Sequence, residues 1–160
     1  MTHQPLVGVS WQEAITYVQW IEHRLPTAKE WESAARGGLI GKKYPNTSNM
    51  DRDQGNYEGS STDGWLDSWS FAASVGSFPA NNYDLYDMAS NVNEWCWTGD
   101  CKADQSNSPA IRGGSWNGAP ERLSLSDSRK MDAEVLSYDI GFRCVIDLAS
   151  VKRNDFRNSN

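Results

Sequence analysis

Residues 82–97 read NYDLYDMASNVNEWCW, a stretch whose order of polar and apolar side chains follows neither the helical nor the strand period. Polar groups at such short spacing let the backbone fold back on itself, which is how loops build an oxygen cage for a hard cation. A polar turn held by Asx hydrogen bonds accounts equally well for the pattern. The polar members are Asp87, Ser90, Asn91 and Glu94, and the expected buried anchors are Leu85, Tyr86, Met88 and Trp95.

A second polar stretch lies upstream, between Leu39 and Ala80, where Gly, Asn, Ser and Asp replace any periodic pattern. A structureless loop of this length is unusual in a compact domain, so we expect something to order it. Asn56 and Asp63 could supply side-chain oxygens to a second cation. Residues 75–78 are expected to form a short strand that closes the loop.

Two helices are predicted at the start of the chain. Ser10 with Glu13 forms a capping box ahead of a helix that runs to about Glu22. Thr27 with Glu30 repeats the box ahead of a second helix, which Gly37-Gly38 ends. Later in the chain, residues 110–116 (AIRGGSW) are expected to form a strand with a Gly-Gly bulge, and residues 139–146 (DIGFRCVI) a final strand. The expected class is therefore α+β, with short antiparallel strands and long loops.

Length and composition favour a single domain, residues 1–148, followed by a polar tail, residues 149–160. Eight Trp, six Tyr and four Phe in a chain of mean hydropathy -0.68 indicate an aromatic core inside a polar chain. The net charge of -6, with no basic stripe, argues against a nucleic-acid partner and agrees with cation binding.

No apolar run approaches the roughly 18 residues of a membrane-spanning helix, so no membrane insertion is expected. The first residues, MTHQPLVGVSW, lack the basic and apolar regions of a signal peptide, which favours a cytoplasmic location. Cys96 and Cys101 are close enough in sequence to pair, although free thiols are the default without an export signal. Zinc is disfavoured, because His3 and His23 are the chain's two histidines and neither adjoins a cysteine.

The motifs of the chain, in their order and spacing, resemble the formylglycine-generating enzyme family, also called sulfatase-modifying factors. They are VGVSWQEA at 7–14, RLPTAKEWESAARGG at 24–38, VGSFPANNYDLYDMASNVNEW at 75–95, RGGSW at 112–116 and GFRCV at 141–145. The resemblance implies a loop-rich variant of the C-type lectin fold. Family domains usually begin with strands before the first helix, so it also implies that this N-terminal part is missing or that another chain supplies it.

The resemblance implies one or two calcium ions. The first would be held by the side chains of Asn56 and Asp63 with the carbonyls of Tyr57 and Trp65. The second would be held by the side chains of Asp87 and Glu94 with the carbonyls of Ser90 and Val92. Asp87 stands where some members have Asn, and its added negative charge should tighten cation binding.

The family's catalysis does not carry over. Its enzymes oxidise a substrate cysteine with two copper-holding cysteines, and the matching positions are Gly118 and Leu123. Ser115 is retained beside them, but a hydroxyl cannot replace a thiolate pair as a soft-metal ligand. Two further departures are Asn93, in place of a family tryptophan, and Val18, where some relatives have a cysteine that pairs with the equivalent of Cys144. The chain is thus not expected to be an authentic formylglycine-generating oxidase, and no copper is expected.

The favoured function is a non-catalytic module that binds a protein or small ligand through the segment 116–138. A segment between two core strands is fixed in position but free in sequence, although it could equally be a solvated connection. The alternatives are an enzyme of different, oxidative tailoring chemistry and the variable display protein of a diversity-generating retroelement. The side chains expected to contact a partner are Trp116, Asn117, Arg122, Arg129, Met131 and Tyr138.

Overall fold

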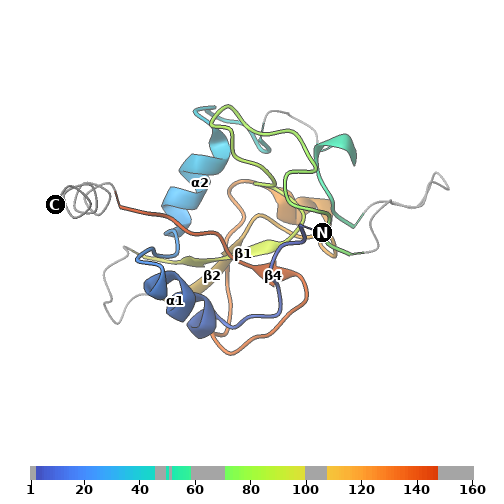
Figure 1. Ribbon diagram of the computed structural model, residues 1–160. Coiled ribbons are helices and arrows are strands. Elements are labelled where there is room, and N and C mark those ends of the chain that lie inside the picture. Colours follow the sequence, from blue (N-terminus) through green and yellow to red (C-terminus); the bar gives the residue numbers. More distant parts are fainter. Residues whose placement is uncertain (1–2, 46–49, 51, 59–70, 100–107, 148–160) are drawn as a thin grey trace.

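The computed structural model describes residues 3–45, 50, 52–58, 71–99 and 108–147. These residues form two short α-helices and a small mixed sheet, and long loops enclose both (Figure 1). The elements are α1 (Trp11–Trp20), α2 (Ala28–Arg36), the 3-10 turn η1 (Arg52–Gln54), β1 (Asn93–Trp97), β2 (Pro109–Arg112), the 3-10 turn η3 (Pro120–Leu123), β3 (Arg129–Lys130) and β4 (Ile140–Gly141). Within the described ranges, no helix is long and apolar enough to cross a membrane.

Both predicted capping boxes are present. Ser10 accepts from the Glu13 N–H while the Glu13 carboxylate accepts from the Ser10 N–H, and Thr27 and Glu30 repeat the exchange. Such a cap contributes about 1 kcal/mol to helix stability. The second helix ends at Gly37, which has φ 55, as the Gly-Gly pair predicted.

The sheet has the order β3-β2-β1-β4. β2 pairs antiparallel with both β1 and β3, but β4 runs parallel to β1, with Glu94 opposite Gly141. The expected antiparallel strands are present in β1, β2 and β3, and β4 adds a parallel pairing that was not expected. The loop ahead of β4 lies beside the N-terminal segment, where the Gly8 N–H donates to the Ser137 carbonyl, and β4 then enters the sheet in the direction of β1.

Three strand predictions need correction. β2 ends at Arg112, because Gly113 (φ 96) and Gly114 (φ 71) turn the chain out of the sheet, so there is no bulge within a longer strand. The final strand is limited to Ile140–Gly141, with a separate bridge between Val145 and Arg24. Residues 75–78 form no strand, since the chain turns at Val75 and Gly76.

β1 lies between two apolar clusters, because successive side chains of a strand point to opposite faces. Trp95 packs with α1, and Cys96 packs with α2, and Figure 1 shows the two helices on either side of the strands. Of the expected anchors, Met88 and Trp95 are buried and Leu85 packs at the margin of the second cluster, but Tyr86 is 49% exposed. Cys96 and Cys144 are free thiols, and Cys101 lies outside the described residues.

An ion pair joins the start of α2 to the end of the described chain. Arg24 donates to both oxygens of Glu30, at 2.7 and 2.8 Å, and also to Asp147. These bonds hold the pKa of Glu30 at about 2, below its ordinary 4.5, against burial, which raises it. The ionised carboxylate is thus favoured by folding, and its stabilisation is present above pH 4.5 and lost as the pH falls toward 2.

We therefore expect Glu30→Gln to flatten the acid side of the stability profile. Glutamine keeps the capping box but removes the titrating charge. Urea unfolding at about pH 5 and about pH 2.5 measures the change. Glu134→Gln is the matched control, because Glu134 is an exposed glutamate in a turn outside α2. An acid-induced loss in Glu30→Gln as large as in the unmodified chain would contradict this assignment.

Candidate functional site

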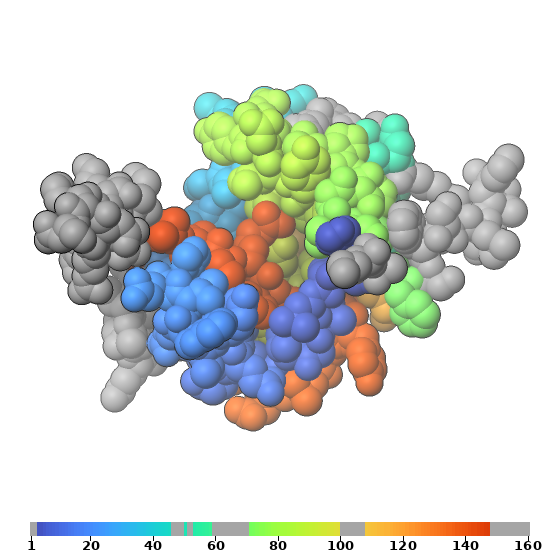
Figure 2. All heavy atoms as spheres, in the orientation of Figure 1, coloured from blue at the N-terminus to red at the C-terminus, as the bar shows by residue number. Residues whose placement is uncertain are grey.

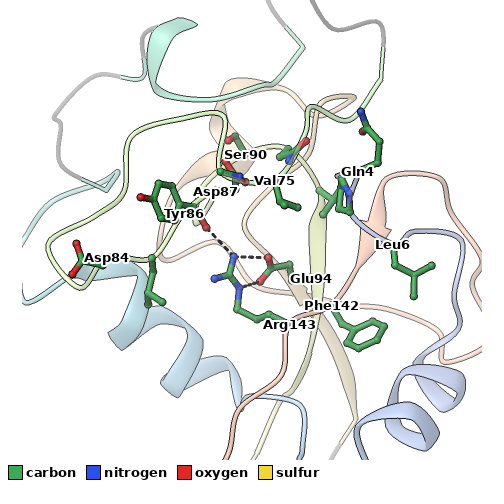
Figure 3. Close-up of a pocket in the computed structure, with 15 residues that line it drawn as sticks. Gln4, Leu6, Val75, Asp84, Tyr86, Asp87, Ser90, Glu94, Phe142 and Arg143 are labelled. Carbon is green, nitrogen blue, oxygen red and sulfur yellow. Dashed lines mark hydrogen bonds and ion pairs between the residues drawn. The ribbon is translucent and has the colours of Figure 1, made fainter. Parts of the chain in front are cut away.

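A cleft of about 590 Å³ opens between the N-terminal segment, the turn at 75–76, the loop leading into β1 and the chain after β4. Figure 2 shows the face on which these segments meet, and Figure 3 shows the side chains that line the cleft. The structure brings together all four residues that the resemblance assigns to the second calcium site, and these are Asp87, Ser90, Val92 and Glu94.

Glu94 lies at the base of the cleft and is only 6% exposed. Its Oε2 accepts from Trp31 Nε1 at 2.6 Å. Arg143 Nε donates to the same oxygen at 2.5 Å, and Arg143 Nη2 donates to Glu94 Oε1 at 2.7 Å (Figure 3). Arg143 also donates to the Tyr86 carbonyl at 3.1 Å. The carboxylate is therefore already paired with one cation, and Oε1 keeps one lone pair for a further ligand.

Asp87 is different, because half of its carboxylate has no partner. It sits in the left-handed region at φ 55, and its Oδ2 accepts from the Gly76 N–H at 2.8 Å. Its Oδ1 is buried without a hydrogen-bond donor among the described residues. Burial raises the pKa of Asp87, and the negative charge of Glu94 raises it further, against the Gly76 bond, the charge of Arg143 and the neighbouring Asn91 side chain, which lower it. A buried acceptor left unsatisfied costs about 1–3 kcal/mol, which a bound cation would offset.

Asn91 is held by hydrogen bonds, as the competing interpretation required of the polar residues in this stretch, but its partners are distant loops and not a local Asx turn. It is fully buried at φ 70, and its amide exchanges two hydrogen bonds with the backbone of Ala73. Its N–H donates to the Asn56 carbonyl, and its carbonyl accepts from the Trp116 N–H. One side chain and its backbone thus join three loops. Asn91 therefore has its polar groups satisfied within the protein, whereas Asp87 retains an oxygen that a cation could bind.

Of the four residues assigned to the first calcium site, the structure describes only Asn56 and Tyr57. Asp63 and Trp65 lie outside the described residues. Asn56 is 2% exposed, and its Nδ2 donates to the Phe71 carbonyl while its Oδ1 is buried without a partner among the residues described. Tyr57 donates its hydroxyl to the Met50 carbonyl. In the part of the chain that the structure describes, no three His, Cys, Asp or Glu side chains group as metal ligands, so a calcium site there would need amide or carbonyl oxygens in addition to its carboxylates.

Neither position that the resemblance matches to a catalytic cysteine offers an accessible side chain that could bind a metal ion. Leu123 is fully buried, and its Cδ2 would lie 2.6 Å from a Cβ added at Gly114. Gly118 has no side chain. Ser115 is 1% exposed and donates to Asp139 Oδ2 at 2.8 Å, and Asp139 also accepts from Asn93 and Ser137. Every polar side chain in this set has a partner within the protein.

Several side chains of the segment 116–138 are held against the rest of the protein, unlike those of a loop that is wholly solvated. Arg129 donates to Asn93 Oδ1 at 2.6 Å and lies 3.2 Å from Asp127, and Met131 packs against the cluster around Trp95. Trp116 makes an edge contact with Phe71, with ring centroids 5.3 Å apart. The exposed members of the expected partner face are Asn117, Arg122 and Tyr138.

Sequence reasoning missed Arg143 as the partner of Glu94. The GFRCV motif contains this arginine, but its role depends on the parallel pairing of β4 with β1, which sets Gly141 opposite Glu94. It also missed the cleft walls at Gln4–Leu6 and Phe142. The sequence did indicate that Glu94 needs a partner, because a buried glutamate in a strand requires a cation beside it. It did not indicate which residue this partner is.

Comparisons with known proteins identify the family of this chain. The model of the Sulfatase-modifying factor enzyme 1-like domain matches residues 1–148. The chain is 36% identical over 155 residues to the serine/threonine-protein kinase pkn1 of Chlamydia caviae, covering 88% of this chain and 24% of that protein. It is 36% identical over 149 residues to the inactive C-alpha-formylglycine-generating enzyme 2 of Bos taurus, covering 88% and 49%. The chain thus spans half or less of these relatives.

Solved structures share the fold. Variable protein 1 of Treponema denticola superposes with a TM-score of 0.75 at 24% identity, covering 89% of this chain and 70% of that one. PvdO from Pseudomonas aeruginosa superposes with a TM-score of 0.71 at 26% identity, covering 89% and 61%. The chain therefore belongs to the sulfatase-modifying factor family, as its motifs predicted, and has the loop-rich, C-type-lectin-like fold of formylglycine-generating enzymes.

Proposed function

We propose that this chain is a non-catalytic binding module on a calcium-stabilised formylglycine-generating-enzyme fold. The observation that carries the proposal is the burial of Leu123, which fills the core at a position where the family's enzymes are expected to present a copper-binding cysteine. Gly118, at the other such position, offers no side chain at all. Copper requires soft thiolate ligands, and neither residue can supply one.

Cys96 and Cys144, the cysteines that the structure describes, do not replace the missing thiol pair. Burial raises the pKa of the Cys96 thiol well above its ordinary value, and burial also raises the pKa of Cys144. The thiolate, not the thiol, is the nucleophile and the metal ligand. Both groups therefore remain protonated near neutral pH and serve as apolar packing in the two clusters.

Two relatives support an accessory role. One carries the name inactive C-alpha-formylglycine-generating enzyme 2, and the other is named a kinase of which the matched region is about a quarter. Because the matched region is the family domain, we assign to this chain the domain and not the kinase activity. Such a domain would hold a partner for an activity that resides elsewhere.

Calcium fits the cleft as a structural ion. Asp87 Oδ1, Glu94 Oε1 and the carbonyls of Ser90 and Val92 would hold it, and all are hard oxygen donors. Asn56 Oδ1 would contribute to the first site in the same way. When bound, calcium would supply a positive charge that balances the carboxylate of Asp87. The rigid loops would then present the exposed Asn117, Arg122 and Tyr138 to a partner.

The absence of formylglycine-generating activity is directly testable. A peptide with the sulfatase-type cysteine motif, incubated with this protein and copper, should keep its mass, because no thiol pair holds the metal. The formylglycine-generating enzyme of Thermomonospora curvata, 39% identical over 120 residues, serves as the positive control in the same mass-spectrometric assay. Conversion of the peptide that depends on this protein would refute the proposal.

Calcium dependence can be isolated at Asp87. We expect calcium to raise the free energy of unfolding by about 2–3 kcal/mol at a concentration near 100 times its Kd, and Asp87→Ala to remove this gain. Asp84→Ala is a matched control, because Asp84 lines the same cleft and has a similar φ of 57. Thermal unfolding with calcium and with a chelator measures both. An equal calcium response in the two variants would exclude Asp87 as a ligand.

The partner face separates into exposed and structural residues. Arg122→Ala with Tyr138→Ala should change stability by no more than about 0.5 kcal/mol yet reduce partner recovery in a pull-down. Arg129→Ala with Met131→Ala should lower stability by about 2 kcal/mol or more, because both side chains pack inward. Urea unfolding distinguishes the pairs. Unchanged recovery of a reproducible partner by the first pair would exclude this face as the binding surface.

A further inference from the structure

The outer side of α1 carries aromatic side chains that the core does not use. The buried residues of this helix are Ala14, Ile15 and Val18. The helical spacing turns Tyr17 and Trp20 outward, and they are 45% and 78% exposed. The outer side of a surface helix is ordinarily polar, so two aromatic residues on it are the start of an exposed patch.

Phe142, in the chain after β4, extends this patch. Its ring centroid lies 5.7 Å from that of Tyr17, which in turn lies 6.1 Å from that of Trp20. Figure 2 shows α1 and the chain after β4 side by side on one face of the molecule. We call Tyr17, Trp20 and Phe142 the aromatic face. Since the planes of the neighbouring rings are inclined by 54° and 63° and Trp20 is largely exposed, the indole keeps an open π-face.

The charges on and just beyond α1 are negative. The helix contains Glu13 and no Lys or Arg, and Glu22, also exposed, follows Trp20 by two residues. The Cα atoms of Trp20 and Glu22 are less than about 8 Å apart, because consecutive Cα atoms are about 3.8 Å apart. The carbonyl end of α1, where Trp20 lies, adds a partial negative charge, and no basic side chain in the last turn offsets it.

The two arginines that adjoin the aromatic face in sequence already have carboxylate partners. Arg24 lies 2.7 Å from Glu30 and 2.9 Å from Asp147. Arg143, which follows Phe142, donates to both oxygens of Glu94. Their charges are therefore balanced within the protein, and the negative charge beside Trp20 is not compensated by them.

The aromatic face also has no cation of its own among the described residues. The cation–π contacts in that part of the chain are those of Lys43 with Tyr44 and of Arg112 with Trp31. An exposed tryptophan in negative surroundings attracts a guanidinium or ammonium group, because the face of its ring carries the negative part of the quadrupole.

We propose that the aromatic face binds a basic segment of a partner protein, with an arginine or lysine side chain over Trp20. Tryptophan is the ring that cations favour most, and a guanidinium group can also stack on it. An anionic membrane surface would repel Glu13 and Glu22 and is disfavoured as the occupant. The aromatic face shares no residue with the exposed partner face or with the calcium ligands, so this inference goes beyond the proposed function and does not depend on it.

Calorimetric titration with a capped tetra-arginine peptide tests the proposal, with the tetra-citrulline peptide as a control of similar shape without charge. We expect saturable binding of the arginine peptide, weaker at high salt, and no binding of the citrulline peptide at the same concentration. Equal binding of the two peptides would mean apolar contact alone and would overturn the proposal. So would the failure of the arginine peptide to bind.

Trp20→Leu locates the binding, because leucine keeps an apolar side chain and a high helix propensity but removes the π-face. We expect the affinity for the arginine peptide to fall about two- to fivefold, as for an exposed cation–π contact. Tyr83→Leu is the matched control, since it removes a ring that is 57% exposed elsewhere, and it should change the affinity less than about 1.5-fold. Both variants keep the net charge of -6, so general electrostatic attraction is the same. Equal affinities in the two variants would overturn the site.

Two further measurements close the remaining outcomes. Urea unfolding should show Trp20→Leu to be as stable as the unmodified chain, because the side chain is exposed. If this variant is destabilised, Glu22→Gln replaces it and should weaken binding more than Glu134→Gln, while equal effects would overturn the site. Sedimentation of the chain alone should show no dimer that Trp20→Leu dissociates, since such a dimer would assign the aromatic face to a second copy of this chain and overturn the proposal.

Discussion

The buried carboxylate of Glu94 is the interaction on which the arrangement of this domain depends. It lies on the central strand, accepts from Trp31 of α2 and from Arg143 beyond β4, and so joins three parts of the chain through one side chain. Removing one member of such a buried pair costs about 3–5 kcal/mol, because the remaining charge is left without compensation. The parallel pairing of β4 places Arg143 within reach, and the sheet and the ion pair therefore require one another.

Buried polar groups take the place of extended secondary structure in the rest of the molecule. Asn91 joins three loops through its backbone and amide, and Arg112 joins α2 to the loop after η3 through Glu32 and the Leu125 carbonyl. Loops held in this way keep their position while their exposed residues vary. Gly118 and Leu123, the positions that the resemblance matches to the family's catalytic cysteines, lie in this loop-rich part of the chain. Leucine at position 123 adds a fully buried side chain to the core instead of a reactive group.

A local imbalance of charge shapes the candidate calcium site in the cleft. In the cleft, Arg143 neutralises Glu94 and leaves Asp87 with a buried, unsatisfied oxygen, so the imbalance is negative and favours a cation.

The sequence alone determined the local features. The capping boxes at Ser10 and Thr27 and the Gly37 stop depend on residues within one helical turn, and the motifs that reveal the family are contiguous. The tertiary structure alone decided which polar residues meet. Arg129 and Met131 pack inward although their segment is polar, Tyr86 is exposed although it sits among buried anchors, and Arg143 reaches Glu94 across 49 residues. Burial and pairing depend on neighbours that are distant in the chain, and no local spacing encodes them.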